Sequence, residues 1–137
     1  MIVDERMVTY IHSLETPEEP IIEQIEQEAK ETFVPIIRKE TQSFLKVLLL
    51  MKKPVRVLEV GTAIGYSAIL MSHYLPEDGR ITTIEKYEKR IPIARENFSR
   101  AAVADRITLL EGDALDIMKS LEEPCLLYTS PSPRDRQ

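Results

Sequence analysis

One stretch decides the fold: Leu58-Glu59-Val60-Gly61-Thr62-Ala63-Ile64-Gly65-Tyr66-Ser67, at a predicted strand-to-helix junction. The β-branched run at residues 55–60 predicts a short buried strand, and residues 65–75 predict a helix. Gly61 can take backbone conformations that other residues avoid. Gly65 and Ser67 lie at the start of the helix, whose free N–H groups attract an anionic group. Because open α/β sheets bind ligands at the carboxyl ends of their strands, we expect a ligand over Gly61.

The strand–helix alternation continues beyond this stretch and is preceded by helices. Further strands are expected at residues 80–84 and 106–110, followed by helices at 87–102 and 114–121. Apolar spacing predicts N-terminal helices at residues 4–14, 16–32 and 39–51, the second beginning at the Thr16-Pro17 helix-start signal. The predicted fold class is therefore α/β: N-terminal helices followed by the first half of a parallel Rossmann-like sheet, with three strands and flanking helices.

Three segments are expected along the chain: a helical cap at residues 1–54, a ligand-binding half-domain at 55–124, and a tail at 125–137. The tail from Cys125 to Asp135 resembles the translation of a transposase adapter used in sequencing libraries, so we predict that it is an artefact. The alternative is a genuine fourth strand, Cys125 to Thr129, followed by a Pro/Ser-rich tail.

Composition narrows the class of protein. The chain has 137 residues, 43% hydrophobic and 30% charged, which is typical of one globular domain. No apolar run is long enough for a membrane span and no signal peptide is recognised, so a cytoplasmic protein is expected. The net charge of −5 argues mildly against a broad nucleic-acid surface. The single cysteine excludes an internal disulfide framework.

Two acidic residues follow the next two predicted strands. A carboxylate at Glu85 can accept hydrogen bonds from ribose hydroxyls, and one at Asp113 can accept from an exocyclic amine beside the small Ala114. Taken singly, Gly61 to Gly65 is more often a tight turn, Glu85 a solvated strand end and Asp113 a helix N-cap. Together at successive strand ends they predict a nucleoside-bearing cofactor.

The cofactor type follows from two further residues. Ala63 replaces the middle glycine that the dinucleotide fingerprint needs for the approach of a pyrophosphate. Glu59 suits an ammonium and would repel a pyrophosphate. S-adenosylmethionine carries an ammonium, a ribose and an adenine, and it matches Glu59, Glu85 and Asp113 in that order. A nucleotide- or NAD-binding module without methyl transfer is the alternative.

The quoted stretch, with Arg80–Glu85 and Glu111–Ala114, resembles the class I methyltransferases, and among them the metal-dependent catechol and caffeoyl-CoA O-methyltransferase family. The motif Gly-Thr-Ala-Ile-Gly-Tyr-Ser at residues 61–67 is most similar to the corresponding motif of the bacterial branch that methylates 5-hydroxyuridine in tRNA. The resemblance implies that the methionine end is held by Glu59, Gly61 and Ser67, the ribose by Glu85, and the adenine by Asp113 and Ala114. It also implies that Ile37 lies where the N-terminal segment covers the cofactor.

The resemblance further implies an enzyme that transfers methyl groups to a hydroxyl with the help of Mg²⁺. The family's metal ligands follow its fourth strand and have no counterpart before Pro124, so we expect no catalytic or metal-binding residue in this chain, which is read as a truncated and inactive fragment. The acceptor stays open between tRNA and small phenols, and a homodimer is possible for a longer parent. A non-functional fragment is the remaining alternative.

Overall fold

The computed structural model describes residues 4–121 and 127–129 of the chain. Its centre is a parallel sheet with strand order β3-β2-β1-β4. The strands are β1 (Arg56–Val60), β2 (Arg80–Glu85), β3 (Ile107–Glu111) and the short β4 (Leu127–Thr129). The register pairs Val57 with Ile81 and Ile81 with Ile107, so the first three strands end at one edge of the sheet. The predicted α/β fold with parallel strands is confirmed.

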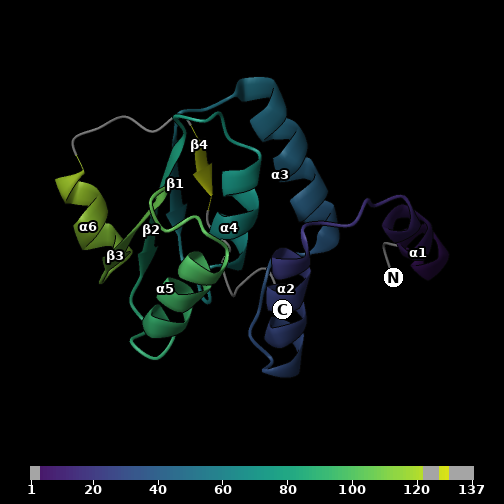
Figure 1. Ribbon diagram of the computed structural model, residues 1–137, viewed down its shortest axis with the longest axis horizontal. Coiled ribbons are helices and arrows are strands. Elements are labelled where there is room, and N and C mark those ends of the chain that lie inside the picture. The colour runs from purple at the N-terminus through teal and green to yellow at the C-terminus, as the bar shows by residue number, and fades with distance from the viewer. Residues whose placement is uncertain (1–3, 122–126, 130–137) are drawn as a thin grey trace.

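Helices cover the sheet in layers (Figure 1). Two helices, α4 (Tyr66–His73) and α5 (Ile91–Arg100), contact β2 and β3 from one side, and α6 (Ala114–Ser120) lies on the opposite side. A further layer outside α4 consists of α2 (Pro20–Glu31) and α3 (Lys39–Lys52). The right-handed β–α–β connections follow from strands that twist and helices that pack back onto them.

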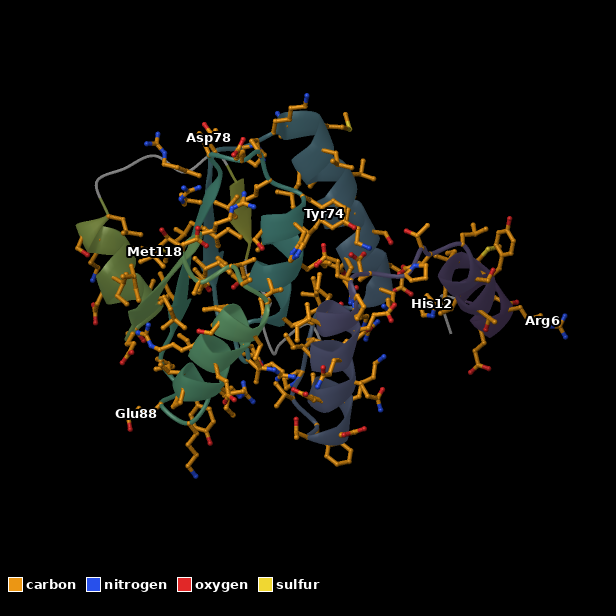
Figure 2. The ribbon with its side chains drawn as sticks, viewed as in Figure 1. Arg6, His12, Tyr74, Asp78, Glu88 and Met118 are labelled. Atoms are coloured by element: carbon orange, nitrogen blue, oxygen red, sulfur yellow. The ribbon has the colours of Figure 1, made fainter. Side chains whose placement is uncertain are left out.

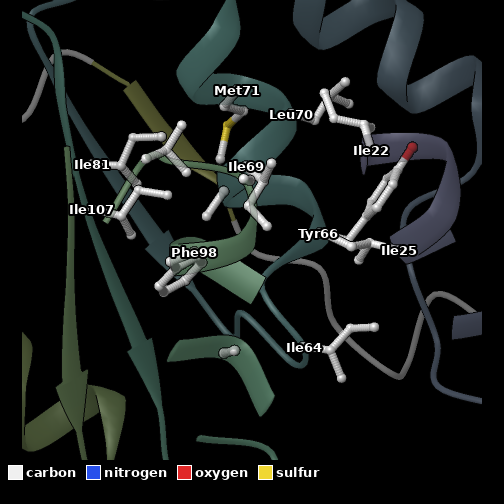
Figure 3. Packing of buried hydrophobic residues seen from close by; sticks show 14 of the residues in the cluster. Ile22, Ile25, Ile64, Tyr66, Ile69, Leu70, Met71, Ile81, Phe98 and Ile107 are labelled. Atoms are coloured by element: carbon white, nitrogen blue, oxygen red, sulfur yellow. The ribbon is translucent and has the colours of Figure 1, made fainter. Parts of the chain in front are cut away.

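The hydrophobic core lies on both sides of α4, which is buried along almost its whole length. Figure 3 shows Ile69 near the sheet residue Ile81, while Tyr66 points toward Ile22 and Ile25 of α2. A helix that is apolar all round must be enclosed, and here the sheet and the N-terminal helices enclose it. The predicted segments 1–54 and 55–124 therefore share one core.

Two helices begin later than the sequence predicted. The second helix begins at Pro20, with Glu19 as its N-cap residue, and not at Thr16-Pro17. The carboxylate of Glu18 contacts Lys46 and accepts a hydrogen bond from Tyr74 at 3.0 Å, which fixes the preceding chain outside the helix. Likewise, the helix expected from residue 87 begins at Ile91, after a turn closed by the Arg90 N–H and the Tyr87 carbonyl at 2.9 Å.

The sheet has a fourth strand where three were expected. The backbone of residues 127–129 pairs in parallel with Val57–Glu59. Extended backbone there is what the alternative of a genuine strand at 125–129 predicts; residues 125, 126 and 130–137 lie outside the described residues. The strand satisfies backbone groups along the edge of β1, which an unpaired strand would leave open.

The first helix, α1 (Glu5–Ser13), lies apart from the other elements (Figure 1) and buries none of its residues. Figure 2 shows His12 on the side of α1 toward the body of the molecule and Arg6 on the far side. His12 Nε2 lies 2.7 Å from the Glu40 carboxylate of α3, so this helix is held by polar contacts. Within residues 4–121 and 127–129, the helices are all too short or too polar to cross a membrane.

Candidate functional site

A cavity of about 360 Å³ lies over the carboxyl ends of β1, β2 and β3. This volume is within the usual range for small-molecule sites, roughly 300–1,000 Å³. Six of the seven residues that the sequence predicted for cofactor binding line it: Ile37, Gly61, Ser67, Glu85, Asp113 and Ala114. The seventh, Glu59, does not. The remaining lining residues are Pro35, Ile36, Val60, Thr62, Ala63, Ile84, Lys86, Arg90, Gly112 and Leu115.

The loop between β1 and α4 forms the floor of this cavity. Gly61 and Gly65 have φ values of 86° and 88°, a region that favours glycine, and Ala63 has φ 51°. The loop is closed by a hydrogen bond of 2.8 Å from the Gly65 N–H to the Thr62 carbonyl. The Gly61 N–H donates to the Ile84 carbonyl at 2.7 Å, which ties the loop to β2. The tight turn that the sequence offered as the alternative to a ligand site is therefore present, and it lines the cavity.

Glu85 fastens this loop from the end of β2. Its Oε2 accepts a hydrogen bond of 2.9 Å from the Ala63 N–H, and its Oε1 accepts from the N–H groups of Lys86 at 3.0 Å and Tyr87 at 2.9 Å. A carboxylate has about four acceptor positions, so roughly one is left for a ligand hydroxyl. Glu85 therefore shapes the site and still presents an acceptor to it, although the sequence predicted two bonds to ribose.

Glu59 lies beneath the cavity floor with no exposed surface. Its carboxylate accepts a hydrogen bond from Ser67 Oγ and another from Thr83 Oγ1 at 2.6 Å. Burial raises the pKa of the Glu59 carboxyl, the hydroxyl groups of Ser67, Thr83 and Thr62 oppose this rise, and the negative charge of Glu85 adds to it. Ser67 lines the cavity and Glu59 does not, so the contact of Glu59 with an ammonium stays a prediction.

Asp113 is the N-cap of α6, which is one of the two roles that the sequence left open, and it also lines the cavity. Its Oδ1 accepts a hydrogen bond of 2.9 Å from the Leu115 N–H, and so it caps α6. Its Oδ2 lies 3.5 Å from Lys86 Nζ on the cavity side. The cap fixes the carboxylate at the mouth of the cavity, next to the small side chain of Ala114.

Other residues of the site were missed by the sequence prediction. Thr83 in β2 and Asn97 in α5 are both fully buried polar residues, and Asn97 Nδ2 donates to the Ile64 carbonyl of the loop at 2.9 Å. An asparagine on the apolar face of a predicted helix is the signal that could have identified it, because a buried amide needs a partner. Lys86 and Arg90 add positive charge to the cavity rim.

The cavity presents groups that a nucleoside-bearing cofactor can use. Carboxylates lie at the rim, the free N–H groups of α4 start at the floor, and apolar walls enclose the space. Thr62 Oγ1 is buried beside the cavity and has no hydrogen-bond partner of ordinary geometry in the described part of the chain. No group of three or more His, Cys, Asp or Glu side chains that could hold a metal exists among residues 4–121 and 127–129.

Known O-methyltransferases are similar to this chain over most of its length. The sequence model of a family described as O-methyltransferase matches residues 11–128. Catechol O-methyltransferase of Niastella koreensis is 36% identical over 80 residues, which cover 58% of this chain and 36% of that enzyme. Caffeoyl-CoA O-methyltransferase 1 of Eucalyptus globulus is 33% identical over 124 residues, which cover 83% of this chain and 49% of that enzyme. The chain thus spans between about a third and a half of the length of these curated relatives.

Solved structures show the same relationship. An O-methyltransferase from Bacillus cereus in complex with SAH superposes with a TM-score of 0.79 at 29% identity, covering 90% of this chain and 59% of that one. An SAH-bound methyltransferase from Podospora anserina gives a TM-score of 0.84 at 26% identity, covering 96% of this chain and 58% of that one. The arrangement of strands and helices is therefore that of known methyltransferases.

Proposed function

The chain belongs to the O-methyltransferase family, and on that premise we propose that it binds S-adenosylmethionine as the cofactor part of an enzyme that methylates hydroxyl groups. The observation that carries this proposal is that Gly61, Glu85 and Asp113, from three successive strand ends, line one cavity of cofactor size. When bound, S-adenosylmethionine supplies an electrophilic methyl group to an acceptor oxygen. The NAD-binding alternative is not favoured, because the matched relatives are methyltransferases.

Each residue around the cavity has a definite task in this proposal. Ser67 lies in the first turn of α4, where the free backbone N–H groups can donate to the methionine carboxylate, while the Ser67 hydroxyl donates to Glu59 below. Glu85 accepts a ribose hydroxyl, and Asp113 accepts from the adenine amine. Ile37 covers the cofactor from the segment before α3.

Binding of S-adenosylhomocysteine (SAH), measured by titration calorimetry on this chain, tests the proposal. Glu85→Ala should weaken binding by at least tenfold, because a hydrogen bond to a charged acceptor contributes about 1.5–3 kcal/mol. Glu85→Gln should weaken it less, since the amide keeps one acceptor oxygen. Glu77→Ala, in the turn before β2, is the matched control and should bind like the original chain. Equal affinity of the Glu85→Ala variant would overturn the site assignment.

For the longer enzyme we propose 5-hydroxyuridine in tRNA as the methyl acceptor, with a small phenol as the competing acceptor. The support is the resemblance of the Gly61–Ser67 loop to the tRNA-modifying branch; Mg²⁺, a homodimer and a cytoplasmic location are proposed on the same ground. The test is transfer of labelled methyl groups to tRNA that carries 5-hydroxyuridine, compared with catechol and caffeoyl-CoA. Transfer to catechol alone would reject the tRNA proposal.

The tail at residues 125–137 is proposed to derive from adapter sequence. This proposal rests on the resemblance of residues 125–135 to translated adapter sequence. Two findings count against it: the family match reaches residue 128, and residues 127–129 pair with β1. Sequencing the source DNA across codon 124 without a transposase library distinguishes an adapter-derived tail from a genuine fourth strand. A different reading frame after Pro124 supports the proposal, and an unchanged sequence refutes it.

A further inference from the structure

One wall of the cofactor cavity comes from a segment remote in sequence from the strand ends. Pro35, Ile36 and Ile37, between α2 and α3, line the cavity opposite the β1–α4 loop. Ile36 and Ile37 are partly buried and pack against the core. This short wall belongs to no helix or strand, so its position depends on contacts made by its neighbours.

Gln42 makes the contact that fixes the wall. This α3 residue is 1% exposed, although its amide group is polar. Its Nε2 donates a hydrogen bond of 3.0 Å to the Ile37 carbonyl, and its Oε1 accepts one of 3.0 Å from the Tyr66 hydroxyl. Both ends of the amide are thus used, each in the role that its chemistry allows. A buried amide bonded at both ends specifies one arrangement of the groups it joins.

Tyr66 connects this bridge to the cofactor loop. It is the first residue of α4, it is buried, and the next residue, Ser67, lines the cavity. Burial raises the pKa of the Tyr66 phenol, and the negative charges of Glu26, Glu18 and Glu15 raise it further. The hydroxyl therefore stays protonated at neutral pH and donates a hydrogen bond to the amide oxygen of Gln42.

We infer that Gln42 is a positioning residue that clamps the Pro35–Ile37 wall against the first turn of α4 and so holds the cofactor cavity closed. That the cavity binds a cofactor rests on the proposed function, whereas the clamp consists of contacts within this chain. It predicts that breaking the Gln42 bridge lets the wall open, which speeds the release of a bound cofactor.

The experiment compares Gln42→Leu, Tyr66→Phe and the double variant with the original chain. Gln42→Leu leaves the Tyr66 hydroxyl and the Ile37 carbonyl unpaired in the interior, so it can also lower stability. The double variant removes the amide and the hydroxyl together, so only the Ile37 carbonyl loses its partner and the loss of stability should be smaller than in Gln42→Leu. Gln24→Leu is the control, because Gln24 makes an exposed bond to Glu28 far from the wall.

Two measurements separate clamping from general stability. The first is the dissociation rate of SAH, which should rise roughly five- to tenfold in Gln42→Leu and in the double variant, as expected for the loss of about one buried hydrogen bond. The second is trypsin cleavage after Arg38, directly beside the wall, followed by mass spectrometry. Cleavage there should be faster in both variants and unchanged in Gln24→Leu.

The two arms also separate this inference from the proposed function. If the double variant releases SAH and is cleaved after Arg38 at the rates of the original chain, the clamp is refuted. If the original chain does not bind SAH, the proposed function fails for this chain, and the cleavage rates still support or refute the clamp. Faster cleavage that is confined to Arg38 supports it, and faster cleavage everywhere assigns Gln42 a purely structural role.

Discussion

Gly65 is the position where the cofactor loop, the backbone and the core constrain one another most tightly. Its φ is +88°, and a Cβ atom placed there would lie 2.6 Å from Cε1 of Phe98 and 3.2 Å from Cδ1 of the same ring. Phe98 is itself buried in α5, between the loop and the sheet. The substitution Gly65→Ala therefore adds both backbone strain and a steric clash.

The expected loss of stability is the sum of opposing contributions. A left-handed conformation costs an alanine about 1–2 kcal/mol, and overpacking a core contact costs about 1–3 kcal/mol. Alanine restricts the unfolded chain relative to glycine, which returns about 0.4–1 kcal/mol. Gly65→Ala should thus lower the free energy of unfolding by about 1–4.5 kcal/mol.

Urea unfolding followed by circular dichroism measures this loss and can divide it into its parts. The double variant Gly65→Ala with Phe98→Leu should recover the steric part, relative to Phe98→Leu alone, because leucine lacks the ring edge that meets the new methyl group. The backbone part should remain. A Gly65→Ala chain within about 0.5 kcal/mol of the original would refute the reasoning, since a surface change alone has an effect of that size.

Three further outcomes are expected. The pKa of Glu59 is raised in the folded state, so the free energy of unfolding of the original chain should fall as the pH rises from the ordinary glutamate pKa of 4.5 through the folded pKa. Glu59→Gln should lack this pH dependence. Urea unfolding of both chains across this pH range measures the difference. Asp113→Ala should destabilise α6 by about 1 kcal/mol, whereas Asp113→Asn keeps the helix cap. Titration of the Asp113→Asn variant with SAH therefore tests the proposed adenine contact without loss of the cap. Unchanged affinity would show that Asp113 does not contact the cofactor. Ala102→Gly should raise the free energy of unfolding by about 0.5–1 kcal/mol, because Ala102 is exposed with φ 55°, and a lower melting temperature would contradict this.

The sequence predicted the first three strands, the order of the elements and six of the cavity-lining residues because these depend on local patterns. β-branched runs, glycine positions and acids at strand ends are visible within a few residues of each other. Parallel topology then follows from the strand–helix alternation, and it brings Gly61, Glu85 and Asp113 to one edge without further information.

What the sequence could not predict depends on contacts between distant segments. The start of α2 at Pro20 is set by contacts of Glu18 with Lys46 and Tyr74, which lie in two other helices. The burial of Glu59 is set by hydroxyls from α4 and β2 that enclose it. Local periodicity predicts neither arrangement, because within its own segment none of these partner residues can be distinguished from a surface residue.

Glu85 shows why a site residue can be identified correctly and still be understood incompletely. The strand-end pattern presents Glu85 as a free acceptor for ribose, yet its carboxylate accepts the N–H groups of Ala63, Lys86 and Tyr87. The residue proposed to bind the ligand is therefore also the residue that holds the loop in its shape. Because one carboxylate does both, replacing it changes binding and loop geometry together. The amide of Glu85→Gln keeps one acceptor oxygen but loses the charge, whereas Glu85→Ala loses both. The difference in affinity between the two variants therefore measures what that one acceptor contributes to the loop and the ligand together.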